Sequence, residues 1–168
     1  MTVDDTAALS DVVATWARAW EQRNPTRIIS LWDVADVESW YLPADSVDPS
    51  LGSAVVGLIQ RRCLATAEIS YRVGKSHCRR LAPDLGLAFF ELAWSDRQTG
   101  HHHDQAHSIG GNVRVTMVMR HYDKSWKIFH YAEAPLAPLL ELQAYYEAVA
   151  ADGLGNIPQR AFAGPASP

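Results

Sequence analysis

Two aspartates in a turn-rich segment are the first candidates for acid–base chemistry. Asp45 and Asp48 lie in the run PADSVDPSLGS at 43–53. A carboxylate beside a cavity can remove a proton from a ligand when loss of solvent raises its pKa. Aspartate and proline also build turns that have no catalytic role. We therefore predict Asp45 or Asp48 as a catalytic base, with an ordinary turn as the alternative.

His130 is the third candidate for a catalytic role. Its imidazole changes charge near neutral pH, so it could act as a base or donate a hydrogen bond to a ligand carbonyl. The run WKIFHYAE at 126–133 predicts a strand, and we expect His130 on its inward, apolar face. The alternative is a core histidine, hydrogen-bonded to a neighbouring strand or to Tyr41.

Glu91 interrupts the apolar run LGLAFFELAWS at 85–95. A carboxylate in so apolar a strand must be paired or must line a pocket. We predict that Glu91 lines the cavity and, together with Tyr41, orients a ligand. An ion pair with Arg72 or Arg79 is the alternative.

A histidine-rich segment, HHHDQAH at 101–107, has the residue types of a transition-metal site. Consecutive residues of an extended chain point to opposite faces, so only alternate histidines could share one metal. The candidate ligands are His101, His103 and His107. A solvated loop without a metal is the alternative, and we predict no cofactor.

Six tryptophans are many for a chain of this length. Aromatic side chains around an interior favour a flat, apolar ligand, although they also serve as core filler. We expect the walls of the pocket to be formed by Trp16, Trp20, Trp32 and Trp94. Met117 and Met119 would form an adaptable floor.

The elements that position these residues follow from the period of the apolar pattern. A period near 3.6 predicts helices over 4–22, 25–32 and 54–67, and a last one from 135 to about 151. A period of two predicts strands over 38–42, 69–81, 85–95, 113–121 and 126–133. Helices followed by long hairpin-linked strands are typical of an α+β fold.

The last hairpin permits a prediction of which residues face inward. Its turn lies at 122–125, between two strands of alternating pattern. The pairs expected on the inward face are His121 with Trp126, Met119 with Ile128, and Met117 with His130. The oppositely charged pair Arg114 and Glu133 then falls on the outward face, where it stabilises the hairpin.

Composition excludes several classes of protein. The chain has 168 residues, 48% of them hydrophobic and 20% charged, with a net charge of −4. This length corresponds to one domain, and no basic face indicates a nucleic-acid partner. No apolar run approaches the roughly 20 residues of a membrane span, and MTVDDTAALS is not typical of a secretory signal. Cys63 and Cys78 are interpreted as reduced thiols of a cytoplasmic protein.

Three segments resemble the nuclear transport factor 2-like superfamily, the cone-shaped α+β barrels that include the SnoaL-like polyketide cyclases and ketosteroid isomerase. AALSDVVATWARAWEQRNPTRIISLWD is similar to the family's paired opening helices. VESWYLPADSVDPSLGSAVVGLIQRR is similar to its first strand, Asp/Pro-rich turn and third helix, and NVRVTMVMRHYDKSWKIFHYAEAP to its final hairpin. Within the turn, Asp48-Pro49 resembles the dipeptide that carries the base of ketosteroid isomerase.

The resemblance implies a curved antiparallel sheet wrapped around the N-terminal helices, a pocket inside the cone and a homodimer packed through the outer sheet face. It implies a small enzyme of the isomerase, cyclase or hydrolase type, acting on a hydrophobic aromatic or polyketide-like carbonyl compound. The alternatives are a non-catalytic binder of small molecules and a metal-dependent enzyme using the histidine segment. We expect one domain over 1–152, whose last helix covers a partner or closes the cone, and a flexible tail over 153–168.

Overall fold

The computed structural model describes residues 3–98, 108–123, 125–136 and 147. Contacts divide the chain into two units after Pro135, and everything below concerns the first unit, Met1–Pro135. Apart from residue 147, the expected C-terminal helix lies outside the described residues, as does the expected tail at 153–168. The predicted limits of the domain therefore stay predictions.

Three helices form where the apolar period predicts them: α1 (Val3–Glu21), α2 (Pro25–Ser30) and α3 (Ala54–Ala65). On α1 the buried stripe includes Leu9, Val13 and Trp16, at the spacing of one helix face. At the start of α2 the Asn24 side chain accepts a hydrogen bond of 3.0 Å from the Arg27 backbone N–H, which satisfies one of the otherwise unpaired donors of the first turn.

Six strands form one sheet: β1 (Trp40–Leu42), β2 (Ser50–Leu51), β3 (Thr66–Ala82), β4 (Leu85–Gln98), β5 (Ser108–Tyr122) and β6 (Ser125–Pro135). Their order across the sheet is β2-β1-β6-β5-β4-β3. The four long strands are antiparallel, as predicted, whereas β1 pairs with β6 in parallel. The sheet is therefore mixed, and the predicted turn segment contributes the short strand β2.

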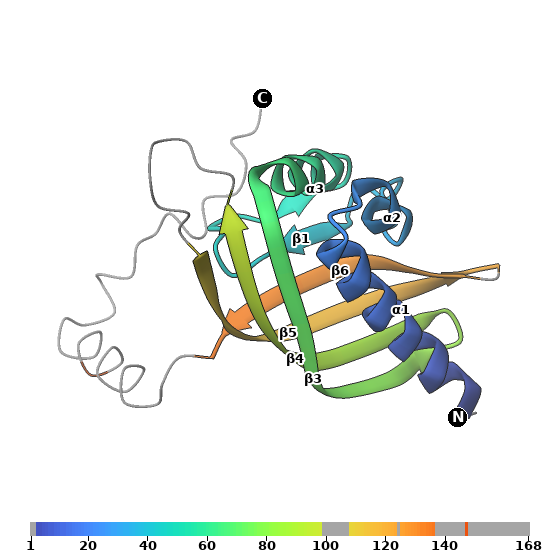
Figure 1. The fold of residues 1–168 in the computed structure, drawn as a ribbon. Helices are drawn as coiled ribbons and strands as arrows, with labels where there is room; N and C mark the ends of the chain where they lie inside the picture. The colour runs from blue at the N-terminus through green and yellow to red at the C-terminus, as the bar shows by residue number, and fades with distance from the viewer. Residues whose placement is uncertain (1–2, 99–107, 124, 137–146, 148–168) are drawn as a thin grey trace. The chain divides into compact units, whose positions relative to one another are not determined.

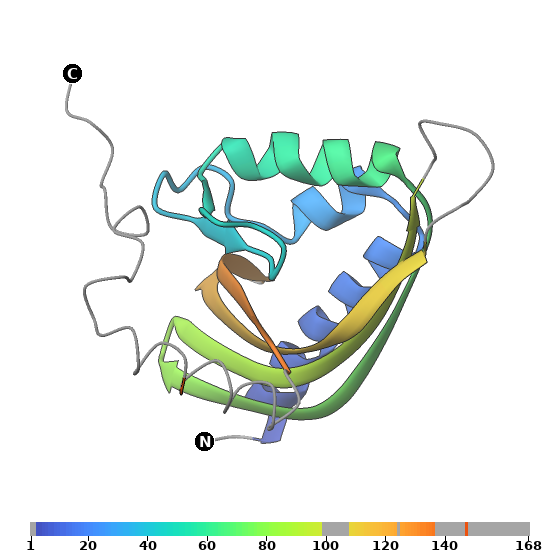
Figure 2. The same cartoon turned by 90° about the vertical axis from the view of Figure 1, so that its left-hand side faces the viewer.

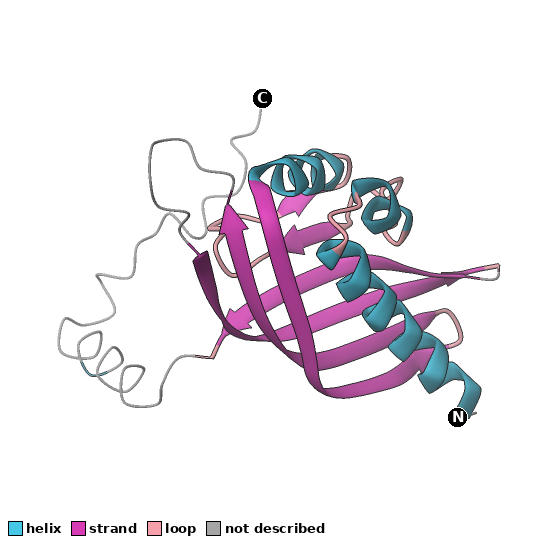
Figure 3. Cartoon of the chain, in the orientation of Figure 1, coloured by secondary structure: helices cyan, strands magenta, loops and turns pink. Residues whose placement is uncertain are grey.

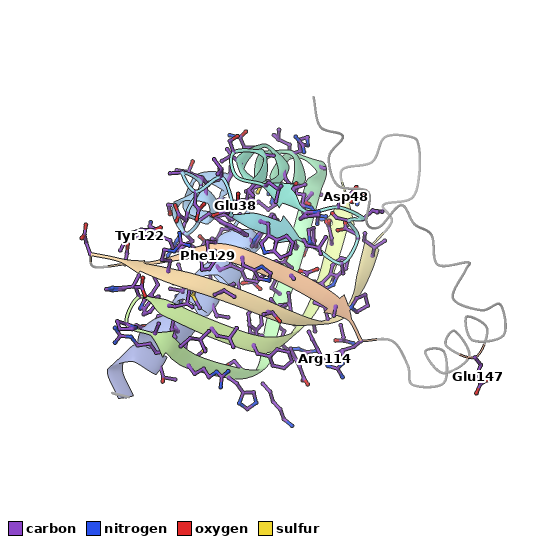
Figure 4. All side chains as sticks on the ribbon, turned by 180° about the vertical axis from the view of Figure 1, so that it is seen from behind. Glu38, Asp48, Arg114, Tyr122, Phe129 and Glu147 are labelled. Atoms are coloured by element: carbon purple, nitrogen blue, oxygen red, sulfur yellow. The ribbon has the colours of Figure 1, made fainter. Side chains whose placement is uncertain are left out.

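The sheet curves around α1, and α3 lies across the open side of the curve (Figures 1 and 2). The helices lie on the concave side of the strands (Figure 3). Seen from behind, α1 is covered by the long strands, and Phe129 and Arg114 are labelled on the face toward the viewer (Figure 4). The expected α+β cone is confirmed, and its interior lies between the concave face and the helices.

A bulge in β6 changes which residues of the last hairpin face inward. The pairs His121 with Trp126 and Met119 with Ile128 are confirmed, but Phe129 is then inserted without a partner of its own. An extra residue in one strand inverts the alternation beyond it. Beyond the bulge Met117 pairs with Tyr131, and the Tyr131 side chain is fully buried.

The residues beyond the bulge therefore correct two predictions. His130 pairs with Val118 and is placed on the outward face, although we expected it to face inward. Glu133, expected opposite Arg114 on the outward face, pairs with Val115 and turns inward instead.

Among the described residues, no helix combines the length and the apolar character that crossing a membrane requires.

Candidate functional site

A pocket of about 170 Å³ lies where the end of α3 meets the sheet. It is bounded by the turn after β1, the last residues of α3, the start of β3 and of β5, and the ends of β4 and β6. The lining residues are Asp45, Arg62, Ala65, Thr66, Ile69, Tyr71, Trp94, Asp96, Gln98, Ile109 and Glu133. The pocket combines apolar walls with four charged groups.

Strand alternation brings four of these side chains to the concave face. On β4 the buried positions Phe90 and Leu92 continue, two residues at a time, to Trp94 and Asp96. On β3, Tyr71 lies opposite Trp94, and the next inward pair is Ile69 with Asp96. A regular antiparallel ladder therefore places one acidic group among aromatic and aliphatic neighbours.

Asp96 carries a carboxyl oxygen that is buried without a partner. The Thr66 hydroxyl lies 3.3 Å from Oδ2 and donates to it, while Oδ1 has no hydrogen-bond partner among the described residues. Burial raises the pKa of the Asp96 carboxyl above its ordinary value, and the Thr66 hydrogen bond opposes this shift. The site therefore favours the protonated acid more than water does.

Glu133 is held by two donors. Its Oε1 accepts a hydrogen bond of 2.5 Å from the Tyr131 hydroxyl, and its Oε2 accepts one of 2.8 Å from the Ala44 backbone N–H. Burial raises the pKa of the Glu133 carboxyl, and both hydrogen bonds oppose this shift because they stabilise the charged form.

An ion pair closes another side of the pocket. Arg62 on α3 donates through Nη2 to Oδ1 of Asp45 in the turn after β1. The Asp45 side chain is 55% exposed and the Arg62 side chain 31%. Asp45 thus lies at the predicted place, beside a cavity, but as the partner of an arginine.

Tyr71 adds a hydroxyl group to the pocket wall. Burial, and with it the negative charge of Glu133, raises the pKa of Tyr71 well above its ordinary value. The hydroxyl therefore keeps its proton at neutral pH and can act as a hydrogen-bond donor.

Three sequence-predicted site residues do not line this pocket. Asp48 is exposed on the turn after β1, where Figure 4 labels it. His130 packs its ring 4.8 Å from that of Trp40 on the outward side, and burial lowers its pKa. Glu91 is exposed on the convex face, so the expectation that it faces the cavity is corrected. Its register partner there is Arg114, not the predicted Arg72 or Arg79.

Most of the expected walls are core. Trp16 has no exposed surface, and its ring centroid lies 5.1 Å from that of Tyr131 and 5.2 Å from that of Tyr71. The other expected wall and floor residues that are at most 3% exposed and do not line the pocket are Trp20, Trp32, Tyr41, Met117 and Met119. These rings fill the interior, so Trp94 alone of the expected tryptophans reaches the pocket.

The histidine segment is not covered by the structure, because His101, His103 and His107 lie outside the described residues. Within the described ranges, no group of three or more histidine, cysteine or acidic residues is arranged to hold a metal ion. The predicted metal alternative therefore stays a prediction.

Three residues of the site were missed in the sequence. Asp96 was assigned to a loop, although the alternation of β4 continues through it and could have revealed it. Arg62 follows the buried stripe of α3 by one residue, which the same pattern could have indicated. Glu133 carried no such signal, because the bulge that turns it inward has no glycine to mark it.

Two raised carboxyl pKa values, a tyrosine hydroxyl and an arginine now surround one small cavity. Carboxyl groups whose pKa lies closer to neutral can both take and give protons under ordinary conditions. The arrangement is therefore suited to general acid–base chemistry on a small ligand.

Sequence comparison finds no protein-family model and no curated protein that matches the chain. Solved structures do match. A protein from Novosphingobium aromaticivorans, provisionally named an aromatic ring hydroxylase, has a TM-score of 0.71 at 12% identity, over 82% of this chain and 93% of that one. A nuclear transport factor 2-like superfamily protein from Salmonella enterica has a TM-score of 0.70 at 12% identity, over 83% and 96%.

A third structure comes from Streptomyces avermitilis and bears the provisional name of a dehydratase of the nuclear transport factor 2-like family. It has a TM-score of 0.68 at 16% identity, over 82% of this chain and 100% of that one. At these identities the likeness shows the fold, and an activity has to be argued from the residues of the pocket.

Proposed function

We propose that this chain, which has the nuclear transport factor 2-like fold, is a small enzyme that moves protons on a carbonyl compound bound in the pocket. Asp96 and Glu133 are its two acid–base groups. Tyr71 donates a hydrogen bond to the carbonyl oxygen, which stabilises the negative charge that develops there. The reaction is of the isomerase or dehydratase type.

The observation that carries this proposal is the buried, unpartnered Oδ1 of Asp96 in a pocket that also holds Glu133. An ionised carboxylate is costly at the Asp96 position, so Asp96 is suited to deliver a proton. Glu133 has two donors that support its charge, so it is suited to remove the proton next to the carbonyl. Two carboxyl groups in different surroundings take different roles in this way.

The size of the pocket narrows the substrate class. Its volume of about 170 Å³ is below the roughly 300–1,000 Å³ of sites for drug-sized ligands. Trp94, Ile69 and Ile109 supply apolar wall. We infer a substrate with one ring or a short chain, smaller than the polyketide-like compounds that the sequence suggested. The dehydratase name of one structural neighbour agrees with this reaction class.

Proton exchange in D₂O tests the proposal without knowledge of the natural substrate. The chain is incubated with cyclohexanone, acetophenone or pyruvate, and loss of the signal from protons next to the carbonyl is followed by ¹H NMR. We expect exchange above buffer for at least one probe. Asp96→Asn and Glu133→Gln should each lower the rate by about a hundredfold or more, the usual contribution of general acid–base catalysis.

Asp48→Asn is the matched control, because it removes an exposed carboxylate from the turn beside the pocket. Its exchange rate should equal that of the parent chain. The proposal is contradicted if the parent exchanges no probe faster than buffer, or if the Asp96 and Glu133 variants keep the parent rate while folded.

A non-catalytic binder is the second candidate, and one observation favours it. Several polar groups of the pocket are bonded to each other or to the fold, as in the Asp45–Arg62 and Thr66–Asp96 contacts. A binder retains a small ligand with one-to-one stoichiometry but exchanges no protons. Titration calorimetry beside the exchange assay separates the two candidates.

A further inference from the structure

Arg62 is the one basic residue among the described residues that line the pocket. Its guanidinium makes one hydrogen bond in the described part of the chain, from Nη2 to Asp45. A guanidinium has five N–H donors in a planar fork that matches the two oxygens of a carboxylate. The contact with Asp45 therefore uses one arm of the fork at the pocket wall.

Asp45 is the more mobile partner by its exposure. Its side chain is 55% exposed, against 31% for that of Arg62, and ion pairs with exposed partners contribute little stability. Arg62 is less easily left without a partner, since a half-buried charge needs compensation. A second carboxylate that enters the pocket can take the place of Asp45 at little net cost.

The turn that carries Asp45 is held independently of the ion pair. The backbone N–H of the preceding residue, Ala44, donates to Oε2 of Glu133 across 2.8 Å. Asp45 can therefore release Arg62 while the turn keeps its place beside the pocket.

We propose that the pocket recognises small monocarboxylates, with Arg62 binding the carboxylate and Asp45 as the group that the ligand displaces. The rest of such a ligand, a single ring or short chain, lies against Trp94 and Ile109. This inference rests on the proposed function, because it names the substrate class of the same pocket: a carbonyl compound that also carries a carboxylate.

Calorimetric titration with benzoate and with benzamide, its neutral counterpart of similar shape, tests this assignment. We expect the parent chain to bind benzoate at least tenfold more tightly than benzamide. Arg62→Met keeps the aliphatic stem and should weaken benzoate binding at least tenfold. Asp45→Asn removes the competing carboxylate and should tighten it several-fold.

Arg61→Met is the matched control, since Arg61 neighbours Arg62 on α3 but is exposed and does not line the pocket. It should bind benzoate as the parent does. Arg62→Lys keeps the charge and loses the fork, so intermediate binding in a variant of normal melting temperature separates recognition from a folding defect.

Equal binding of benzoate and benzamide, unchanged binding by Arg62→Met, or no binding of benzoate by either the parent or Asp45→Asn overturns the inference. The exchange assay fails or succeeds separately. Benzoate binding through Arg62 with no effect of Asp96→Asn and Glu133→Gln on exchange would contradict the proposed function alone. The reverse result would contradict the carboxylate assignment alone.

Discussion

Asp96 and Glu133 show how the same chemical group acquires two roles from its surroundings. Both carboxyl groups have pKa values raised by burial. Glu133 has a donor on each oxygen, whereas Asp96 has a donor on one and none on the other. The difference lies in two local contacts, a hydroxyl two residues away on β6 and a backbone N–H on the turn after β1.

Asp96→Asn should stabilise the fold, and more so at high pH. A carboxyl group with a higher pKa in the folded state binds more protons there, so its contribution to stability falls as the pH rises from the ordinary pKa through the raised one. Asparagine does not ionise, and its amide oxygen can still accept from Thr66. Thermal unfolding at pH 4.5 and pH 8 should show a larger gain in melting temperature at pH 8.

The same measurement on Asp48→Asn provides the comparison, because that carboxylate is exposed. Its melting temperature should follow the parent at both pH values. A gain for Asp96→Asn that is greater at pH 4.5 than at pH 8 would contradict the direction of the pKa shift.

At the residue scale, the sequence predicted part of the site. It indicated Trp94 and the aspartates of the turn after β1, of which Asp45 lines the pocket. It placed His130 and Glu133 on each other's faces, because a strict period of two was assumed through Phe129. The inserted residue is an ordinary phenylalanine, and its ring packs 4.5 Å from the Arg120 guanidinium, a contact that a single sequence does not reveal.

At the scale of elements, prediction from the sequence was more complete. The three helices, the four long strands and both hairpins form where the apolar periods and turn residues indicate. The short strand β2 and the parallel pairing of β1 with β6 were missed, because a three-residue and a two-residue strand depend on partners far along the chain. Long periodic elements carry their own signal, whereas short edge strands do not.

The packing of α1 on β4 predicts opposite effects for two glycine substitutions. A Cβ on Gly86 would overlap Leu9 Cδ2 and lie 3.2 Å from Trp126 Cζ3, and Leu9 is fully buried. Gly86→Ala should therefore destabilise the fold by about 1–3 kcal/mol, the usual cost of overpacking.

Gly57→Ala on α3 is the contrasting variant. Its Cβ would meet only the end of the flexible Arg61 side chain, at 3.2 Å, and alanine favours a helix by about 1 kcal/mol over glycine. Urea unfolding should show a lower midpoint for Gly86→Ala and a higher one for Gly57→Ala. Equal midpoints for the two variants would show that α1 does not press on β4 as described.

At the scale of the whole first unit, the aromatic interior explains why the pocket lies at its edge. Stacked rings of α1, β1, β3 and β6 occupy the centre of the cone. A ligand therefore has room only where α3 meets the strand ends. The sequence predicted many aromatic residues in the cone, but it could not show that they pack against one another and leave no central cavity.

The convex face of the sheet is expected to form the homodimer that the fold resemblance implies. Phe89 on this face is 39% exposed. Phe89→Asp should convert a dimer into a monomer, because a charge at an apolar interface is costly. Light scattering after size-exclusion chromatography measures this, with Val47→Asp, at an 88% exposed position off the long strands, as the control that stays dimeric. A parent chain that runs as a monomer would contradict the expectation.

The central claim is that one small pocket holds two carboxyl groups ready to exchange protons near neutral pH. A ¹³C NMR titration of the aspartate and glutamate carboxyl signals tests it most directly, with Asp96→Asn and Glu133→Gln used to assign the two resonances. The account predicts two signals that titrate above the ordinary values of about 3.9 for aspartate and 4.3 for glutamate, each missing in its own variant. Titration of both groups at or below those values would contradict it.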